Sequence, residues 1–166
     1  LLADIEREGP RTTLLAFAGT CLLVALFFRS RAESGQLIGA LTVGVLLMAG
    51  VASAIGLKVN FFNFIVYPIT FGIAVDYGAN VLARQRARGT VLPALVEVGP
   101  AGVLCSWATI VGYGSLLFSI NKALRSFGWY AMLGELTTLF TALLLLPALA
   151  LAWPRLRGAE EVKHAA

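Results

Sequence analysis

The stretch Phe61–Arg84, read FFNFIVYPITFGIAVDYGANVLAR, is an apolar run long enough to cross a bilayer, with a single acid, Asp76, well inside it. Placing a charged side chain at the centre of a membrane costs roughly 2.5–3.5 kcal/mol on insertion scales. An ionisable residue at such a position is therefore interpreted first as functional. The alternative is a protonated carboxyl that hydrogen-bonds between helices and serves only packing. The stretch predicts a membrane helix organised around Asp76, with the packing role kept open.

The composition of the whole chain is that of a membrane protein. Of its 166 residues, 58% are hydrophobic and 13% are charged, whereas soluble domains average about 45–50% apolar and 25% charged residues. The chain begins at Leu1 and shows no signal-peptide pattern, so we expect a piece of a longer protein. Cys21 and Cys105 lie in apolar runs, which predicts neither a disulfide nor a metal site. The net charge of +4 comes mostly from short connections and does not indicate nucleic-acid binding.

Five apolar runs predict an all-α, polytopic membrane fold. The predicted spans are residues 12–28, 37–57, 61–82, 99–120 and 129–153. Residues 1–11 are expected to end an extracytoplasmic segment, with Gly9 and Pro10 as a break before the first span, and residues 154–166 to form a cytoplasmic tail. The mixed apolar and polar residues Val91–Val98 predict a short helix on the cytoplasmic membrane surface. Asn121–Gly128 is predicted to be a turn before the fifth span.

The distribution of basic residues predicts the orientation in the membrane, because cytoplasmic connections carry the excess of Lys and Arg. With the first end outside, eight basic residues lie inside and five outside. The inside set is Arg29, Arg31, Arg84, Arg86, Arg88, Arg155, Arg157 and Lys163, and the outside set is Arg7, Arg11, Lys58, Lys122 and Arg125. We therefore expect an extracytoplasmic N-terminus and a cytoplasmic C-terminus.

A polar stripe is predicted on the central helix. Gly72, Asp76 and Asn80 are spaced by four residues, which places them on one helix face, and Arg84 continues the spacing toward the cytoplasmic end. The glycine removes side-chain bulk beside the acid, so a facing helix can approach closely. Small residues four apart in the second span, such as Ala40 and Gly44, likewise predict close helix packing. The stripe indicates an ionisable site that water can reach.

Proton binding is the chemistry that this arrangement favours. A carboxyl that moves between a dry and a wet environment changes its affinity for a proton, so Asp76 can load and release one as helices move. Tyr77 can donate a hydrogen bond to the ionised acid. Ser106 and Thr109 on the fourth span are candidates for the same role, although such hydroxyls commonly bond to their own backbone. Glu135 lies near the start of the fifth span and is expected to be solvated at the interface.

The segment GIAVDYGANVLARQRARG resembles the G-x-x-x-D segment of the resistance-nodulation-division superfamily of transporters. Its Asp-Tyr pair is similar to that of the mycobacterial-membrane-protein-large and hopanoid-exporter branches. The order that follows, a basic segment, then GPAGVLCSWATIVGYGSLLFS, an aromatic-rich turn and LTTLFTALLLLPALALAW, also resembles those proteins. The resemblance covers essentially residues 12–153.

The resemblance implies the last five spans of one six-span repeat, the second repeat being favoured, in an exporter driven by the proton-motive force. Asp76 and Tyr77 would then be the proton-relay pair and Gly72 the motif glycine. The implied partners are the lipid bilayer, protons, a lipid or other hydrophobic substrate, and an N-terminal half that bears a sister Asp helix. Self-association into a homo-oligomer is kept open, and no cofactor is implied. The implied location is the bacterial inner membrane.

Two other classes of function are compatible with the same residues. A sterol-sensing-like module that binds lipid or regulates has the same five-span arrangement, and a protein-export auxiliary of the same superfamily stays open as well. Intramembrane proteolysis is not expected, because it needs two facing acids or a serine with a histidine. The only histidine is His164 in the tail, and Glu135 is expected at an interface, away from Asp76. The sequence predicts neither catalytic residues nor a metal ligand set.

Overall fold

The fold is helical wherever the structure assigns regular secondary structure. A computed structural model describes residues 2–28, 30–57 and 60–152 of the chain. Its elements are α1 (Leu2–Phe27), α2 (Arg31–Ala54), α3 (Phe61–Arg88), α4 (Val91–Ser115), a 3-10 turn η1 (Leu116–Phe118), α5 (Lys122–Phe140) and a π-helical turn η2 (Thr141–Leu145). The α-helix resumes over residues 146–152. Five helical stretches among the described residues are long and apolar enough to cross a membrane, as the sequence predicts.

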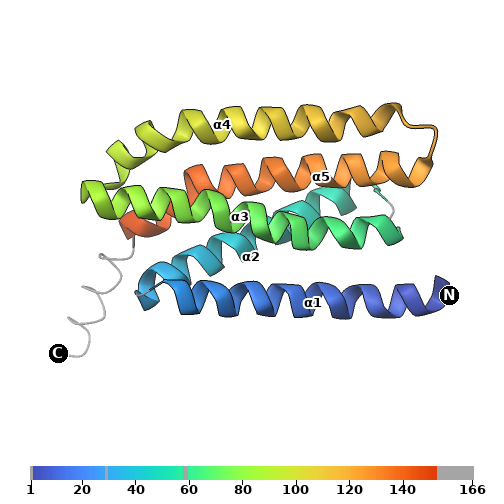
Figure 1. Ribbon diagram of the computed structural model, residues 1–166, viewed down its shortest axis with the longest axis horizontal. Coiled ribbons are helices and arrows are strands. Elements are labelled where there is room, and N and C mark those ends of the chain that lie inside the picture. The colour runs from blue at the N-terminus through green and yellow to red at the C-terminus, as the bar shows by residue number, and fades with distance from the viewer. Residues whose placement is uncertain (1, 29, 58–59, 153–166) are drawn as a thin grey trace.

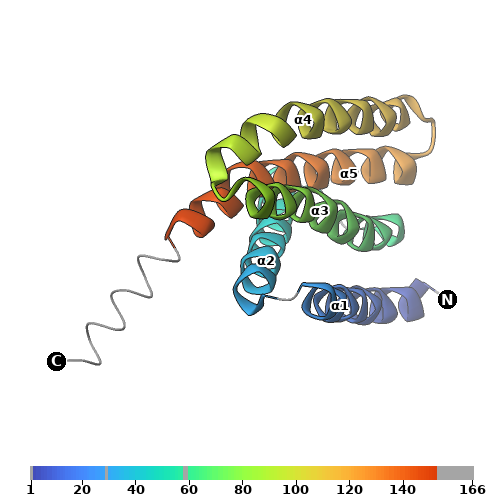
Figure 2. The ribbon, with the colours of Figure 1, turned by 60° about the vertical axis from the view of Figure 1, so that its left-hand side comes forward.

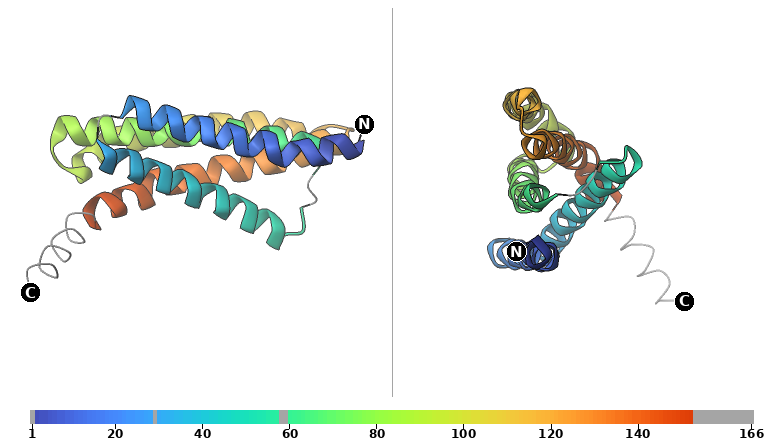
Figure 3. Two further views of the ribbon diagram at one scale, coloured as in Figure 1. Left: turned by 90° about the horizontal axis from the view of Figure 1, so that it is seen from below. Right: turned by 90° about the vertical axis from the view of Figure 1, so that its right-hand side faces the viewer.

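The helices run up and down, and α3 lies between α4 and α1 in the view of Figure 1. α3 packs against each of the other four α-helices, whereas α1 packs chiefly against α3. Seen end-on, α1 and α4 lie on either side of α3, and α2 and α5 lie together along one face of α3 (Figure 3, right). The turned view separates α1 from α4 and α5 (Figure 2). One side of α3 therefore faces outward between α1 and α4.

Local sequence signals fix where the helices begin and end. The Asn60 side chain accepts a hydrogen bond from the Asn63 backbone N–H at 3.2 Å and so caps the start of α3. Asn121 caps α5 in the same way through the Ala123 N–H at 2.9 Å. α3 ends at Arg88, and the next residue, Gly89, has a φ of 74°, a left-handed conformation that favours glycine. These caps satisfy backbone groups that a helix end leaves unpaired.

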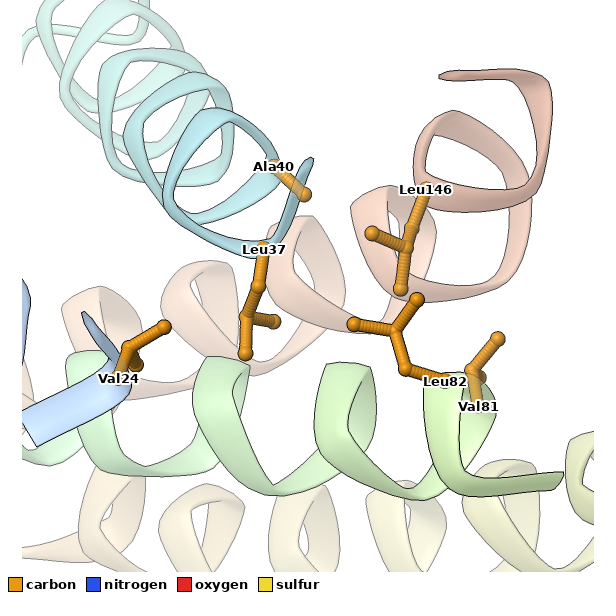
Figure 4. Close-up of a cluster of buried hydrophobic side chains, with 6 residues drawn as sticks. All are labelled: Val24, Leu37, Ala40, Val81, Leu82 and Leu146. Carbon is orange, nitrogen blue, oxygen red and sulfur yellow. The ribbon is translucent and has the colours of Figure 1, made fainter. Parts of the chain in front are cut away.

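Apolar side chains from four helices close the core at the end where α2 begins. The cluster combines α1, α2, α3 and the helical turns that follow α5. It contains Val24, Leu37, Ala40, Val81, Leu82 and Leu146. Figure 4 shows Leu37 and Leu146 pointing from their helices toward α3. A second cluster, around Met48, Val66 and Tyr130, closes the opposite half of the bundle. These contacts fix the positions of α2, α3 and α5 relative to one another.

The predicted break at Gly9 and Pro10 is absent, because α1 runs through both residues. A Cβ at Gly9 would lie 2.6 Å from the Phe64 ring, so this glycine permits α1 to approach α3 closely. Pro10 is exposed and is accommodated within the helix. The glycine that indicated a loop is instead required for packing.

Val91–Val98 do not form a separate surface helix, because they are the first turns of α4, which continues through Pro100. Val91 and Ala94 are buried in the bundle, which explains why this segment packs against the protein. The predicted turn Asn121–Gly128 is also shorter, because α5 already begins at Lys122. Both α4 and α5 therefore begin earlier than the sequence predicts.

Several predicted features lie outside the described residues. They are the charges of Arg29 and Lys58, the end of the fifth span at Trp153, and the tail over residues 154–166.

Of the small-residue pairs predicted in the second span, now part of α2, Ala40 and Gly44 are buried as expected. A Cβ at Gly44 would lie 3.0 Å from Thr141 Oγ1, which shows how closely the two helices approach. Gly50 is exposed and has no such neighbour.

Ion pairs join three helices at the end where α3 terminates. Arg86 pairs with Glu33 of α2 through both its Nε and its Nη2. Glu97 of α4 accepts from Arg88 Nε at 3.0 Å and pairs with Arg84 Nη1 at 2.9 Å. The pairs lie at the surface, where such interactions contribute little stability. They orient the ends of α2, α3 and α4 relative to one another.

The predicted orientation can be tested at the two ends of the bundle. In a background lacking Cys21 and Cys105, we expect Ala87→Cys to react with a membrane-impermeant thiol reagent only in opened cells. Lys122→Cys is expected to react in intact cells, because the arginine bias places it outside. Both positions are exposed, and Ala87 makes none of the ion pairs. The reverse labelling pattern would contradict the orientation.

Candidate functional site

Asp76 lies on the outward face of α3. It follows the start of the helix at Phe61 by fifteen residues, which corresponds to about 22 Å along the axis at 1.5 Å per residue. Gly72, Asp76 and Asn80 are all exposed and share this face, as the spacing predicts. A Cβ at Gly72 would meet nothing within 4 Å, so no described helix of this chain closes over the site. The face is open near the middle of α3.

Apolar side chains of α1 border this face. A groove of about 290 Å³ runs between α1 and α3 and is lined by Thr20, Leu23, Val24, Phe27, Phe28, Gly72 and Val75. Asn80 donates its side-chain N–H to the Asp76 backbone carbonyl at 3.0 Å and does not contact the carboxylate. Arg84 leaves the stripe, since its guanidinium pairs with Glu97. The polar stripe therefore consists of Gly72, Asp76 and Asn80.

Tyr77 points into the bundle rather than toward Asp76. Consecutive residues of an α-helix are rotated by about 100°, so the two side chains leave α3 in different directions. The Tyr77 hydroxyl donates a hydrogen bond to Glu135 Oε1 of α5 at 2.5 Å. The expected contact between Tyr77 and Asp76 is absent. The hydroxyl instead ties α3 to α5.

Glu135 is a buried acid, which corrects the expectation that it is solvated at an interface. Its side chain is 1% exposed. α5 begins at Lys122, thirteen residues before it, so Glu135 lies about 20 Å along the helix. Its Oε2 atom has no hydrogen-bond partner among the described residues. The fifth span thus carries its own acid in the interior of the bundle.

Ser106 of α4 completes this buried polar cluster. It is 1% exposed, its hydroxyl makes no hydrogen bond to the described residues, and it lies beside the Tyr77 hydroxyl. Thr109 does not take part, because its hydroxyl bonds to the Cys105 backbone carbonyl at 3.0 Å. We call Tyr77, Glu135 and Ser106 the interior cluster. It joins α3, α4 and α5.

The chain therefore carries two polar sites on different sides of α3. Asp76 occupies the open face, and the interior cluster lies where α3, α4 and α5 meet.

The spacing of Gly72, Asp76 and Asn80 predicted correctly that they share one helix face, but the sequence analysis did not identify Glu135 as a buried acid. A usable signal was present, since Ala131, Gly134, Glu135 and Thr138 recur at helical spacing and are all buried. Small residues around an acid indicate a packed interface more than a solvated end.

Comparisons with known protein families, with curated protein sequences and with solved structures found no match to this chain. A proposal about its function therefore depends on the residues and their arrangement.

Proposed function

We propose that this chain is part of a proton-driven membrane transporter that exports lipid or other hydrophobic molecules. The observation that carries the proposal is Asp76, the only charged residue between Phe61 and Ala83 of α3, exposed on an open face at mid-helix. A carboxylate left facing lipid at that depth is costly. A helical unit that covers the face would remove this cost and would leave an acid able to exchange protons.

The sequence resemblance to the resistance-nodulation-division superfamily supports the same proposal. The resemblance implies a sister Asp helix in the other repeat, and packing of that helix against α3 would cover the face that holds Gly72, Asp76 and Asn80. Gly72 has room for such an approach, because no described residue lies close to the position of its missing side chain. The proposed location is the inner membrane of a bacterium, and the proposed substrate is hydrophobic.

Proton flux in membrane vesicles tests this function. Everted vesicles that contain the intact protein are energised with an imposed proton gradient and followed with a pH-sensitive dye. Adding a hydrophobic extract of the host membrane is expected to release protons from the lumen faster than in protein-free vesicles. A protonophore added beforehand should abolish the difference. If no extract produces a protein-dependent flux, proton-driven export is contradicted.

A further inference from the structure

The interior cluster contains an acid that the proposed proton site at Asp76 does not use. Glu135 of α5 is buried and accepts one hydrogen bond from Tyr77 at 2.5 Å, while its second oxygen has no partner among the residues that the structure describes. The buried Ser106 hydroxyl likewise makes no hydrogen bond within the described part of the chain. Buried polar atoms are normally paired, so two unpaired atoms in one cluster require an explanation.

Among the described residues, the groups around Glu135 are hydroxyls, and none of them is a cation. α3 contributes Tyr77, and α4 contributes Ser106 beside Tyr77 and, two turns farther along, Tyr113. α2 packs against α5 near Gly44 and Met48, and this part of α2 holds no titratable residue.

The basic residues of these helices lie at their ends. They are Arg31 in α2, Arg84, Arg86 and Arg88 in α3, and Lys122 and Arg125 in α5. α4 carries none. A permanent carboxylate at Glu135 would therefore be a buried charge without an opposite charge, an arrangement that proteins avoid. Uptake of a proton removes that charge without any change in the packing.

We propose that Glu135 is a second proton-binding carboxyl of the membrane interior, loaded and unloaded at Oε2 and held in place by Tyr77. One proton binds to the free oxygen and the carboxylate loses its charge, and release returns the same proton from the same atom. Tyr77 keeps its own proton and donates to Oε1 in both states, which makes it a positioning residue. The Ser106 hydroxyl lies beside that of Tyr77.

The inference deepens the proposed function and rests on it, because it connects Glu135 to Asp76 through the backbone of α3. Tyr77 directly follows Asp76, so a movement of α3 that changes the exposure of Asp76 also moves the hydroxyl bound to Glu135. Conversely, a change of charge at Glu135 alters how strongly it holds Tyr77. Two acids on different sides of one helix would then respond to the same movement.

Infrared difference spectroscopy across a pH titration tests the inference on the purified protein in lipid nanodiscs. A protonated carboxyl has a C=O stretching band that disappears as the pH rises and the acid ionises. We expect one such band to be lost in Glu135→Gln and kept in Asp76→Asn. In Tyr77→Phe the band should move to higher frequency, because the carboxyl loses the hydrogen bond to Oε1.

A second measurement avoids dependence on the folding of the variants. A hydrophobic carbodiimide attacks protonated carboxyls in apolar surroundings, and peptide mass spectrometry locates the adduct in the unmodified sequence. We expect labelling of Glu135 that falls as the pH rises. Absence of labelling, or labelling that does not change over the whole range in which the protein stays folded, would overturn the inference in favour of a packing role.

These readouts need no transport, so the two proposals fail separately. A Glu135 that titrates in a protein without proton-driven flux would uphold proton binding in the interior cluster and remove the transport function. A Glu135 that never titrates in a protein that does transport would remove only this inference.

Discussion

Asp76→Asn is expected to reduce proton-driven transport to the level of vesicles without protein, while membrane insertion and folded yield remain close to those of the unmodified protein. The amide keeps the size of the side chain and most of its hydrogen bonding but cannot bind and release a proton. Asp76→Glu keeps a titrating carboxyl and moves it by one methylene, so partial transport is expected. Transport in energised vesicles and folded yield by size-exclusion chromatography measure the two effects separately.

The matched control is Thr42→Val in α2. Thr42 is a polar residue within a span whose hydroxyl bonds to the Ile38 backbone carbonyl at 2.7 Å, so its loss removes polarity without removing a titrating group. Transport should be preserved in this variant. If Asp76 serves only packing, the neutral amide should be tolerated at least as well as glutamate, because it avoids the cost of a charge in hydrocarbon. Full transport by the Asn variant would end the proton-carrier role.

The helical class and the five helices able to span a membrane could be predicted, because long apolar runs are a strong signal in sequence. The helix boundaries could not. Gly9 and Pro10 are typical of a break, yet Gly9 is required for the contact with Phe64, and that contact involves a residue 55 positions away. The fourth span likewise was predicted to begin at residue 99, but buried residues at Val91 and Ala94 extend α4 ahead of that position. Tertiary packing decided both ends.

The candidate site, too, could be predicted only in part. The spacing of Gly72, Asp76 and Asn80 within one helix was sufficient to place them on one face. The partner of Tyr77 lies 58 residues later in the chain, and no local spacing identifies it. An interface role for Glu135 followed from placing the start of the fifth span at Trp129. With the helix starting at Lys122, the same residue lies more than three turns from its end.

The interior cluster depends on a close approach of α3 and α5, and Gly134 permits that approach because it has no side chain. A Cβ at this position would lie 2.5 Å from Thr70 Oγ1 of α3 and 3.1 Å from Met48 Sδ of α2. Thr70 is 2% exposed and Met48 is fully buried. Gly134 also precedes Glu135 directly, so any separation of the helices acts on the hydrogen bond to Tyr77. Packing and chemistry are therefore coupled at this point of α5.

Gly134→Val is expected to destabilise the bundle by more than the roughly 1–3 kcal/mol typical of adding methylenes to a packed core. The sulfur of Met48 lies on a flexible chain and can yield. Thr70 cannot yield in the same way, because its β-branched side chain is restricted within a helix, so α3 and α5 must move apart. Thermal unfolding in detergent, followed by circular dichroism, should show a melting temperature lower by several degrees and a reduced folded yield.

Gly112→Val in α4 is the matched control, because this glycine is exposed and a Cβ there would meet nothing within 4 Å. Its melting temperature should stay near that of the unmodified protein. Thr70→Ala removes both Thr70 atoms that crowd the Gly134 position, so combining it with Gly134→Ala should cost less stability than the sum of the two single variants. Strict additivity, or an equal loss of stability in Gly112→Val, would show that close packing at Gly134 does not hold α3 against α5.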